Sequence, residues 1–167
     1  ELGMPGLRLR RDVPVTIHKG HKPELYKGDA EDLTQFGIPD GAFVVACTAR
    51  AVPRKGIPVF IEAINGFPPG LNIHVLMAGT KMDSPLHQEL VAKNTYAANI
   101  HLYGFLKRMP WILKGVHVSV LPSLKREGLS RAMLEAMIAG VVPIVTNSGG
   151  SPELVEKDVS GFVIEPG

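Results

Sequence analysis

From residue 42 onward, short apolar runs alternate with segments in which apolar residues recur at helical spacing. The runs are apolar at consecutive positions, a pattern typical of strands buried on both faces of a parallel sheet. They predict strands over 43–48, 72–78, 100–103, 116–121, 142–146 and 161–164. The segments between them predict helices over 57–64, 84–94 and 107–114, after Gly128, and from Ser151. Strands that alternate with helices predict an α/β fold, with a doubly wound, Rossmann-like parallel sheet covered by helices on both faces.

Residues 1–41 lack this regularity and contain several prolines and glycines. Residues 13–17 are a short strand candidate, and residues 29–36 have room for one or two helical turns. We therefore predict two parts. An irregular N-terminal segment or interdomain linker covers residues 1–41, and a Rossmann-like domain covers residues 42–167.

The composition excludes several functional classes. The chain has 167 residues, of which 45% are hydrophobic and 20% charged, as in an ordinary soluble domain. Its net charge of +2 gives no reason to expect nucleic-acid or membrane binding through bulk electrostatics. The single cysteine, Cys47, stands in an apolar run, so we expect a buried thiol and neither a disulfide nor a zinc framework. No apolar stretch is long enough to cross a bilayer and no signal peptide is visible, so we expect a cytoplasmic protein.

The candidate chemistry concentrates around two glutamates, Glu127 and Glu135, which seven residues separate. The first lies in a loop after a predicted strand, and the second lies inside the helix that follows. Ligands of an open parallel sheet bind beyond the carboxyl ends of its strands. Two carboxylates there suit a ligand with hydroxyls at both ends, while Gly128 and the helix N-terminus suit an anion between them, as in a nucleotide-sugar. The alternative is that Glu127 is solvated and Glu135 forms an ordinary helical pair with Arg131.

A basic loop follows the first predicted strand. Arg50, Arg54 and Lys55 precede Gly56 and the helix that starts there. Arginine binds phosphate through a planar fork, and lysine does so as a mobile point charge. Because this loop and Glu127 both follow strands, we expect them at one edge of the sheet as a diphosphate clamp; a solvated basic loop is the alternative. The G-x-G-x-x-G pattern of dinucleotide sites is missing, which argues against NAD or FAD.

Other loops are expected at the same edge. Residues 147–151 contain two glycines and suit either an anion-binding turn or a merely tight turn. Ser151 is expected to cap the helix that follows, with Pro152 as its first residue. Residues 77–80 and 103–106 end the second and third strands, so they are candidates for the wall of the crevice.

Metal and nucleophile chemistry are not indicated. The histidines show no metal-ligand spacing, and His74, His101 and His117 fall inside predicted strands, where we expect structural roles. No Asp-x-Asp element is present to hold a divalent metal on a diphosphate. No Gly-x-Ser-x-Gly elbow or Cys–His arrangement suggests a covalent nucleophile. We therefore expect neither a metal nor a cofactor.

Taken together, these motifs resemble a known family. The residues that carry the resemblance are Arg50, Lys55-Gly56, Gly79, Tyr103-Gly104, Leu121-Pro122-Ser123, Glu127-Gly128, Glu135-Ala136-Met137, Pro143-Ile144-Val145 and Gly149-Gly150-Ser151-Pro152-Glu153. From about residue 13 to its end, the chain resembles the C-terminal, nucleotide-sugar-binding domain of a GT-B fold retaining glycosyltransferase of family 4, the "glycosyl transferases group 1" type. The two-glutamate motif is specific to that family when it stands in register with the Arg/Lys loop.

The resemblance implies a role for each matching residue. Arg50 and Lys55 would hold the donor diphosphate and stabilise the leaving nucleotide, and Glu127 would face the donor sugar; these three are the catalytic candidates. Glu135 would accept hydrogen bonds from the ribose. The remaining donor-binding candidates are positions near the sugar, the phosphates and the base: Gly79, Tyr103, Gly104, Phe105, Leu106, Gly128, Leu129 and Ser130.

The chain departs from the family pattern at the first glutamate. Many members read Glu-Gly-Phe-Gly where this chain has Glu127-Gly128-Leu129-Ser130. A similar form occurs in a subset of bacterial surface-polysaccharide enzymes, so the donor sugar is left open. The resemblance also implies that an N-terminal acceptor domain and a C-terminal helical tail lie outside this chain.

The activity that the resemblance implies is transfer of a hexose from a nucleoside diphosphate to a saccharide or lipid-linked acceptor, as in polysaccharide biosynthesis. The acceptor would bind through the missing N-terminal domain, so this chain alone would be inactive. No nucleic-acid partner is implied, and membrane contact would be at most peripheral, at the inner face of the cell membrane. Two alternatives stay open: a GT-B fold nucleotide-sugar 2-epimerase, and a non-catalytic sugar-nucleotide-binding module.

Overall fold

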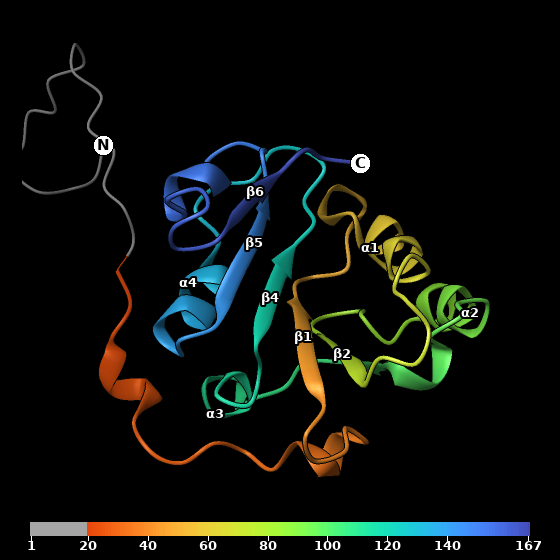
Figure 1. The fold of residues 1–167 in the computed structure, drawn as a ribbon. Coiled ribbons are helices and arrows are strands. Elements are labelled where there is room, and N and C mark those ends of the chain that lie inside the picture. Colours follow the sequence, from red (N-terminus) through yellow and green to blue (C-terminus); the bar gives the residue numbers. More distant parts are fainter. Residues whose placement is uncertain (1–19) are drawn as a thin grey trace, which may run out of the picture.

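The computed structural model describes residues 20–167, and within them the chain forms a six-stranded sheet (Figure 1). Its strands are β1 (Phe43–Thr48), β2 (Ile73–Ala78), β3 (Ile100–Tyr103), β4 (Val118–Leu121), β5 (Val142–Thr146) and β6 (Phe162–Ile164). They lie in the order β3-β2-β1-β4-β5-β6, and every neighbouring pair is parallel. The predicted doubly wound α/β fold is confirmed. The strand candidate at 13–17 lies outside the described residues.

Helices cover both faces of the sheet. In Figure 1, α1 (Ile57–Ile64) and α2 (Pro85–Ala92) lie on one side, and α3 (Met109–Leu113) and α4 (Arg131–Ile138) lie on the other. Short 3₁₀ helices complete the connections: η1 (Pro23–Tyr26), η2 (Leu33–Phe36), η3 (Pro53–Lys55), η4 (Ala97–Asn99) and η5 (Ser151–Leu154).

The sheet separates two hydrophobic cores, because successive side chains of a strand point to opposite faces. In β1, Val44 and Ala46 pack into the core that contains α3 and α4, while Val45 and Cys47 pack into the core that contains α1 and α2. Cys47 is fully buried, and burial raises the pKa of its thiol to about 12 although the nearby charge of Lys55 lowers it. The expectation of a buried thiol is therefore confirmed.

The chain reverses its direction of travel across the sheet between β1 and β4. From β1 it moves outward through β2 and β3, and it then returns to β4 and moves outward on the other side through β5 and β6. Ligands of open α/β sheets bind in the crevice beyond the carboxyl ends of the two strands at such a reversal. The loops that follow β1 and β4 are the basic loop and the loop that carries Glu127.

The helix predicted from Ser151 is only a short 3₁₀ helix, and its predicted cap is wrong. The structure has only the four-residue η5, whose N-cap is Gly150, and Ser151 is its first residue. The backbone is extended again at Val155, and an isolated bridge between Lys157 and Gly161 precedes β6.

The strand histidines have the structural roles that were expected. The Nδ1 of His117 accepts a hydrogen bond from the amide of Val44 at 3.0 Å. His74 and His101 hydrogen-bond to each other, with 2.9 Å between their ring nitrogens, and burial lowers the pKa of both.

Residues 20–41 lie against the α3–α4 side of the domain. The amide of Glu31 donates to the carbonyl of Trp111 at 3.0 Å, and the carboxylate of Glu31 pairs with Arg108 at 3.0 Å. The ring of Phe36 packs edge-on against Tyr103. His21, near the start of this segment, lies beside Glu135 of α4.

Candidate functional site

The loops after β1 and β4 pack against each other at the reversal point. The amide of Leu124 donates to the carbonyl of Arg54 at 2.8 Å. Gly56 has a φ of 65°, and a Cβ on it would lie 2.1 Å from the carbonyl oxygen of Pro122. Only glycine allows the two backbones to approach so closely. The basic loop and the glutamate loop therefore form one packed unit.

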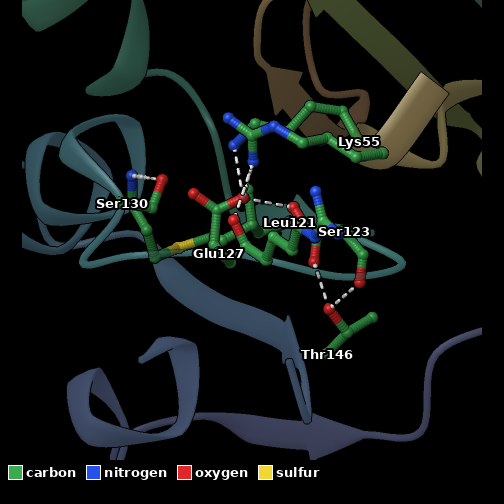
Figure 2. A network of polar contacts seen from close by, with 9 residues as sticks. Lys55, Leu121, Ser123, Glu127, Ser130 and Thr146 are labelled. Carbon is green, nitrogen blue, oxygen red and sulfur yellow. Dashed lines mark hydrogen bonds and ion pairs between the residues drawn. The ribbon is translucent and has the colours of Figure 1, made fainter. Parts of the chain in front are cut away.

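Glu127 lies at the centre of this unit and accepts three side-chain donors on a single oxygen (Figure 2). Its Oε2 lies 2.6 Å from the Nζ of Lys55 and 3.4 Å from a guanidinium nitrogen of Arg54. The hydroxyl of Ser123 donates to the same oxygen at 2.6 Å. The side chain of Glu127 is 7% exposed and that of Lys55 is 10% exposed. The alternative of a solvated Glu127 is therefore wrong.

The surroundings of Glu127 favour its charged form. Burial on its own would raise the pKa of the carboxyl, because a charge is poorly solvated away from water. The hydrogen bonds from Lys55 and Ser123, together with the charges of Lys55 and Arg54, outweigh burial and hold the pKa of Glu127 below its ordinary value. The group is thus an ionised acceptor at neutral pH, and it orients two cations at the mouth of the crevice.

The backbone of Glu127 is fixed by the loop after β5. Its carbonyl accepts a hydrogen bond from the amide of Gly150 at 2.9 Å. Gly149 has a φ of 59°, and a Cβ there would lie 1.9 Å from the same carbonyl oxygen. The glycine pair therefore makes a tight turn that holds the glutamate loop in place. The interpretation as an anion-binding turn stays a prediction.

The second glutamate of the motif, Glu135, lies in α4. Ser130 is the N-cap of this helix, and its hydroxyl accepts from the amide of Met133 at 3.4 Å. Arg131 lies 3.7 Å from Oε1 of Glu135, so the helical pair expected in the alternative interpretation does form. Glu135 is nevertheless not confined to that pair, because it also lines a cavity.

This cavity has a volume of about 320 Å³ and lies at the carboxyl edge of the sheet. Arg50 and Glu135 contribute its charged groups. Its wall is otherwise made of small and apolar residues from the ends of β1 and β2, the loops after β1, β2 and β3, and helices α3 and α4: Thr48, Ala49, Ala78, Gly79, Thr80, Phe105, Leu106, Met109 and Ala132. The arrangement places a cation and a hydroxyl-accepting carboxylate in one partly apolar hollow.

The candidate residues that follow β2 and β3 differ in whether they line the cavity. Gly79 must be glycine, since a Cβ would lie 1.9 Å from the carbonyl oxygen of Ala49. Phe105 lines the cavity and is 75% exposed, so a large apolar ring faces solvent there. Tyr103 instead directs its ring into the contact with Phe36, and neither it nor Gly104 lines the cavity.

The catalytic candidates thus fall into two neighbouring groups. Arg50 lies in the cavity with Glu135, whereas Lys55 lies in the ion cluster with Glu127. Gly128, Leu129 and Ser130 connect the groups along the chain and do not line the cavity. Their roles toward a ligand stay predictions.

Sequence reasoning missed several residues that contact these groups. The Nε2 of His21 lies 3.5 Å from Oε1 of Glu135, and the charge of Glu135 adds to the effect of burial in raising the pKa of Tyr26 to about 12. Both come from an irregular segment with no pattern that places it. Ser123 stood in the family-like motif without a role, and Thr146 had no signal beyond its place at the end of a strand.

A larger hollow, of about 680 Å³, lies at the opposite, amino edge of the sheet. Its lining residues come from the segments 65–72 and 95–99, and none of them carries a charged side chain. It therefore lacks the chemistry of the carboxyl edge. Within residues 20–167, no group of three or more His, Cys, Asp or Glu side chains is placed to hold a metal ion. The same residues contain no helix long and apolar enough to cross a membrane.

The comparisons with known proteins agree with this geometry. The family model described as "Glycosyl transferases group 1" matches residues 29–167, and the chain belongs to this family. A UDP-Gal:alpha-D-GlcNAc-diphosphoundecaprenol alpha-1,3-galactosyltransferase from Escherichia coli is 31% identical over 148 residues, which cover 86% of this chain and 38% of that protein. The chain thus spans about two fifths of the length of this relative.

Solved structures show the same fold. The crystal structure of HepE from Anabaena in complex with UDP and glucose aligns with a TM-score of 0.80 and 26% identity, over 90% of this chain and 43% of that one. The C-terminal domain of a glycosyl transferase group 1 family protein, LpcC from Francisella tularensis, aligns with a TM-score of 0.65 and 26% identity. That alignment covers 88% of this chain and 80% of that one. The chain is therefore a C-terminal, Rossmann-like domain of a GT-B fold.

Proposed function

We propose that this chain, as the C-terminal domain of a group 1 glycosyltransferase, binds the nucleoside diphosphate sugar from which the intact enzyme transfers a hexose. The observation that carries the proposal is the convergence of Arg50, Lys55, Glu127 and Glu135 at the reversal point of the sheet. The UDP-Gal in the name of the Escherichia coli relative, and the UDP and glucose bound in the HepE structure, support the ligand class.

Each group suits one part of such a donor. The cavity of Arg50 and Glu135 has an apolar wall for a nucleoside, a carboxylate that accepts hydrogen bonds from ribose hydroxyls, and a cation for phosphate. The ion cluster beside it offers Lys55 to the diphosphate and Glu127 to hydroxyls of the sugar. Since Glu127 already orients Lys55, the phosphates would meet a cation held in place before they bind.

The proposed chemistry is mainly electrostatic. The bond between the anomeric carbon and the diphosphate oxygen breaks, the acceptor hydroxyl oxygen forms the new bond to that carbon, and the proton of that hydroxyl passes to the departing diphosphate. Negative charge grows on the departing diphosphate, and preoriented cations stabilise charge that develops in the transition state. Arg50 and Lys55 are assigned this role, and no side chain is assigned as a nucleophile.

The finer features rest on the resemblance of the motifs. We propose retention of the anomeric configuration and membership of family 4, as the two-glutamate motif implies. We also propose a saccharide or lipid-linked acceptor, held by an N-terminal domain outside this chain, and work in the cytoplasm or at the inner face of the membrane. The lipid diphosphate in the name of the Escherichia coli relative supports that acceptor class.

The rival functions give different products. A nucleotide-sugar 2-epimerase would convert the nucleotide-sugar without any acceptor, and a scaffold module would bind it and convert nothing. Incubation of the full-length protein with nucleotide-sugar, with and without acceptor, separates the three. Release of nucleoside diphosphate that depends on the acceptor supports the glycosyltransferase.

The binding site is tested by isothermal titration of this chain with UDP-, GDP- and ADP-sugars. The nucleotide-sugar that binds best is then titrated into Arg50→Ala, Lys55→Ala and Glu135→Ala. We expect each variant to lose at least tenfold in affinity, about 1.4 kcal/mol. Lys93→Ala is the control, because within the described part of the chain its ion pair is with Glu89 of α2 and both side chains are exposed. Unchanged affinity in all three site variants would refute the assignment.

A further inference from the structure

The two carboxylate oxygens of Glu127 have different surroundings. The donors from Lys55, Arg54 and Ser123 all end on Oε2. Within residues 20–167, no hydrogen bond or ion pair ends on Oε1. An ionised carboxylate has lone pairs on both oxygens, so Oε1 keeps its full capacity to accept from a ligand.

Ser123 is one of the groups that fix Oε2, and it differs from the two cations. Its side chain is fully buried, and its hydroxyl donates to Oε2 at 2.6 Å. Lysine and arginine side chains carry several rotatable bonds, and each can turn toward a phosphate when one arrives. Ser123 has a single side-chain torsion and belongs to the packed backbone after β4. It is therefore the anchor of Glu127 that a ligand does not displace.

Thr146, at the end of β5, holds Ser123 in turn (Figure 2). Its hydroxyl has one proton and lies 2.6 Å from the carbonyl oxygen of Ser123 and 3.4 Å from that of Leu121. The shorter contact is the hydrogen bond that matters. Thr146 is 3% exposed, so water does not compete for either group.

The loop after the same strand fixes the backbone of Glu127. Gly150 donates to the carbonyl of Glu127, and Gly149 packs against that carbonyl where no side chain fits. Strand β5 and its loop therefore hold Glu127 at two points, the carbonyl directly and the carboxylate through Ser123. Yet none of residues 146–150 lines the cavity.

We propose that Thr146 and Ser123 are positioning residues that form a buried relay, Thr146 to Ser123 to Glu127, and direct Oε1 of Glu127 at the sugar part of the donor. The proposal rests on the function proposed above. A structural role alone would satisfy buried polar groups and would leave Glu127 unaffected. The relay requires instead that changes at Ser123 and Thr146 reach Glu127 and the sugar, while the nucleotide half of the site stays as it is.

A readout without ligand is the titration of Glu127, followed by carboxyl ¹³C NMR. Its charge is faced by Lys55 and Arg54, which all variants keep. Because the Ser123 hydroxyl helps to hold the pKa of Glu127 down, we expect Ser123→Ala to raise that pKa and Thr146→Val to raise it less. Thr146→Ser keeps a hydroxyl and should restore the wild-type titration. Ser119→Ala removes a different buried serine hydroxyl, one that lies in β4, and should leave the titration of Glu127 unchanged.

A second readout compares a nucleoside diphosphate with its sugar form by isothermal titration. For Ser123→Ala we expect about a tenfold loss, about 1.4 kcal/mol, in affinity for the nucleotide-sugar, and a change within about twofold for the nucleoside diphosphate. Equal losses for both ligands, or no loss for either, would overturn the relay. If the wild-type chain binds neither ligand, the proposed function fails. The Glu127 titration then still decides the relay, which an unmoved pKa in Ser123→Ala and Thr146→Val would refute.

Discussion

The ion cluster around Glu127 makes a strong prediction for Glu127→Gln. The substitution keeps the size of the side chain but removes the negative charge between Lys55 and Arg54. Lys55 is then left almost buried beside a second cation. Breaking a fully buried ion pair by removing one partner costs about 3–5 kcal/mol. Because a third of the Arg54 side chain is exposed and water can reach it, we expect roughly 2–3 kcal/mol here.

Urea unfolding followed by circular dichroism at pH 7 measures this loss. For a domain of this size, each kcal/mol lowers the thermal midpoint by about 2–4 °C, so a drop of roughly 5–10 °C is expected as well. The double variant Lys55→Met/Glu127→Gln removes the stranded cation. It should therefore be more stable than Glu127→Gln alone. If the double variant instead loses the sum of the two single losses, Lys55 and Glu127 do not act as a pair.

The stability that Glu127→Gln loses should depend on pH. The ordinary pKa of the glutamate is 4.5, and in the folded chain it is lower. A lowered pKa means that the ionised group stabilises the fold above about pH 4.5, and that this contribution disappears as the pH falls through the lower folded value. The gap between the wild type and Glu127→Gln should be constant from pH 7 to about 5 and shrink below that. A gap that persists unchanged at pH 3 would refute the account of the cluster.

Three further predictions concern the loops and the ligand. Gly149→Ala should be clearly less stable than Gly140→Ala in thermal unfolding and should weaken nucleotide-sugar binding. Both glycines have a positive φ, but only a Cβ at Gly149 meets the Glu127 carbonyl, and equal losses would refute the role of that contact. EDTA should leave nucleotide affinity within about twofold, since protein cations are proposed to offset the diphosphate charge; a tenfold loss restored by magnesium would contradict this. This chain alone should show no sugar transfer to simple acceptors in a product assay, because acceptor positioning supplies much of the rate of a bimolecular reaction. Robust turnover would disprove the need for a second domain.

The strands were predicted well because parallel strands buried on both faces appear in the sequence as uninterrupted apolar runs. Three of the predicted strand starts moved by a residue or two: β2 begins at Ile73 rather than Asn72, β4 at Val118 rather than Val116, and β6 at Phe162 rather than Gly161. The last helix was overpredicted, since Ser151 and Pro152 give a start signal, whereas the backbone is already extended at Val155 and the chain goes on to pair β6 with β5.

The site was predictable only in part. The order of strands and loops brings Arg50, Lys55, Glu127 and Glu135 to one edge, and the pattern shows that order. The pattern does not show that Lys55 pairs with Glu127 while Arg50 shares a cavity with Glu135, because side-chain directions in loops far apart in sequence decide this. The approach of His21 to Glu135 depends on the path of an irregular segment, for which sequence periodicity offers no rule.

The central claim, a nucleotide-sugar site at the reversal point, is tested most directly by an NMR titration of the ¹⁵N-labelled chain. The account predicts that UDP-, GDP- or ADP-sugar shifts the amide signals of residues 48–56, 79–81, 103–107 and 127–131 together with Glu135. Signals of residues 65–72, at the opposite edge, should stay in place. Saturating shifts centred on that opposite edge, or no shifts with any of these nucleotide-sugars, would contradict the account.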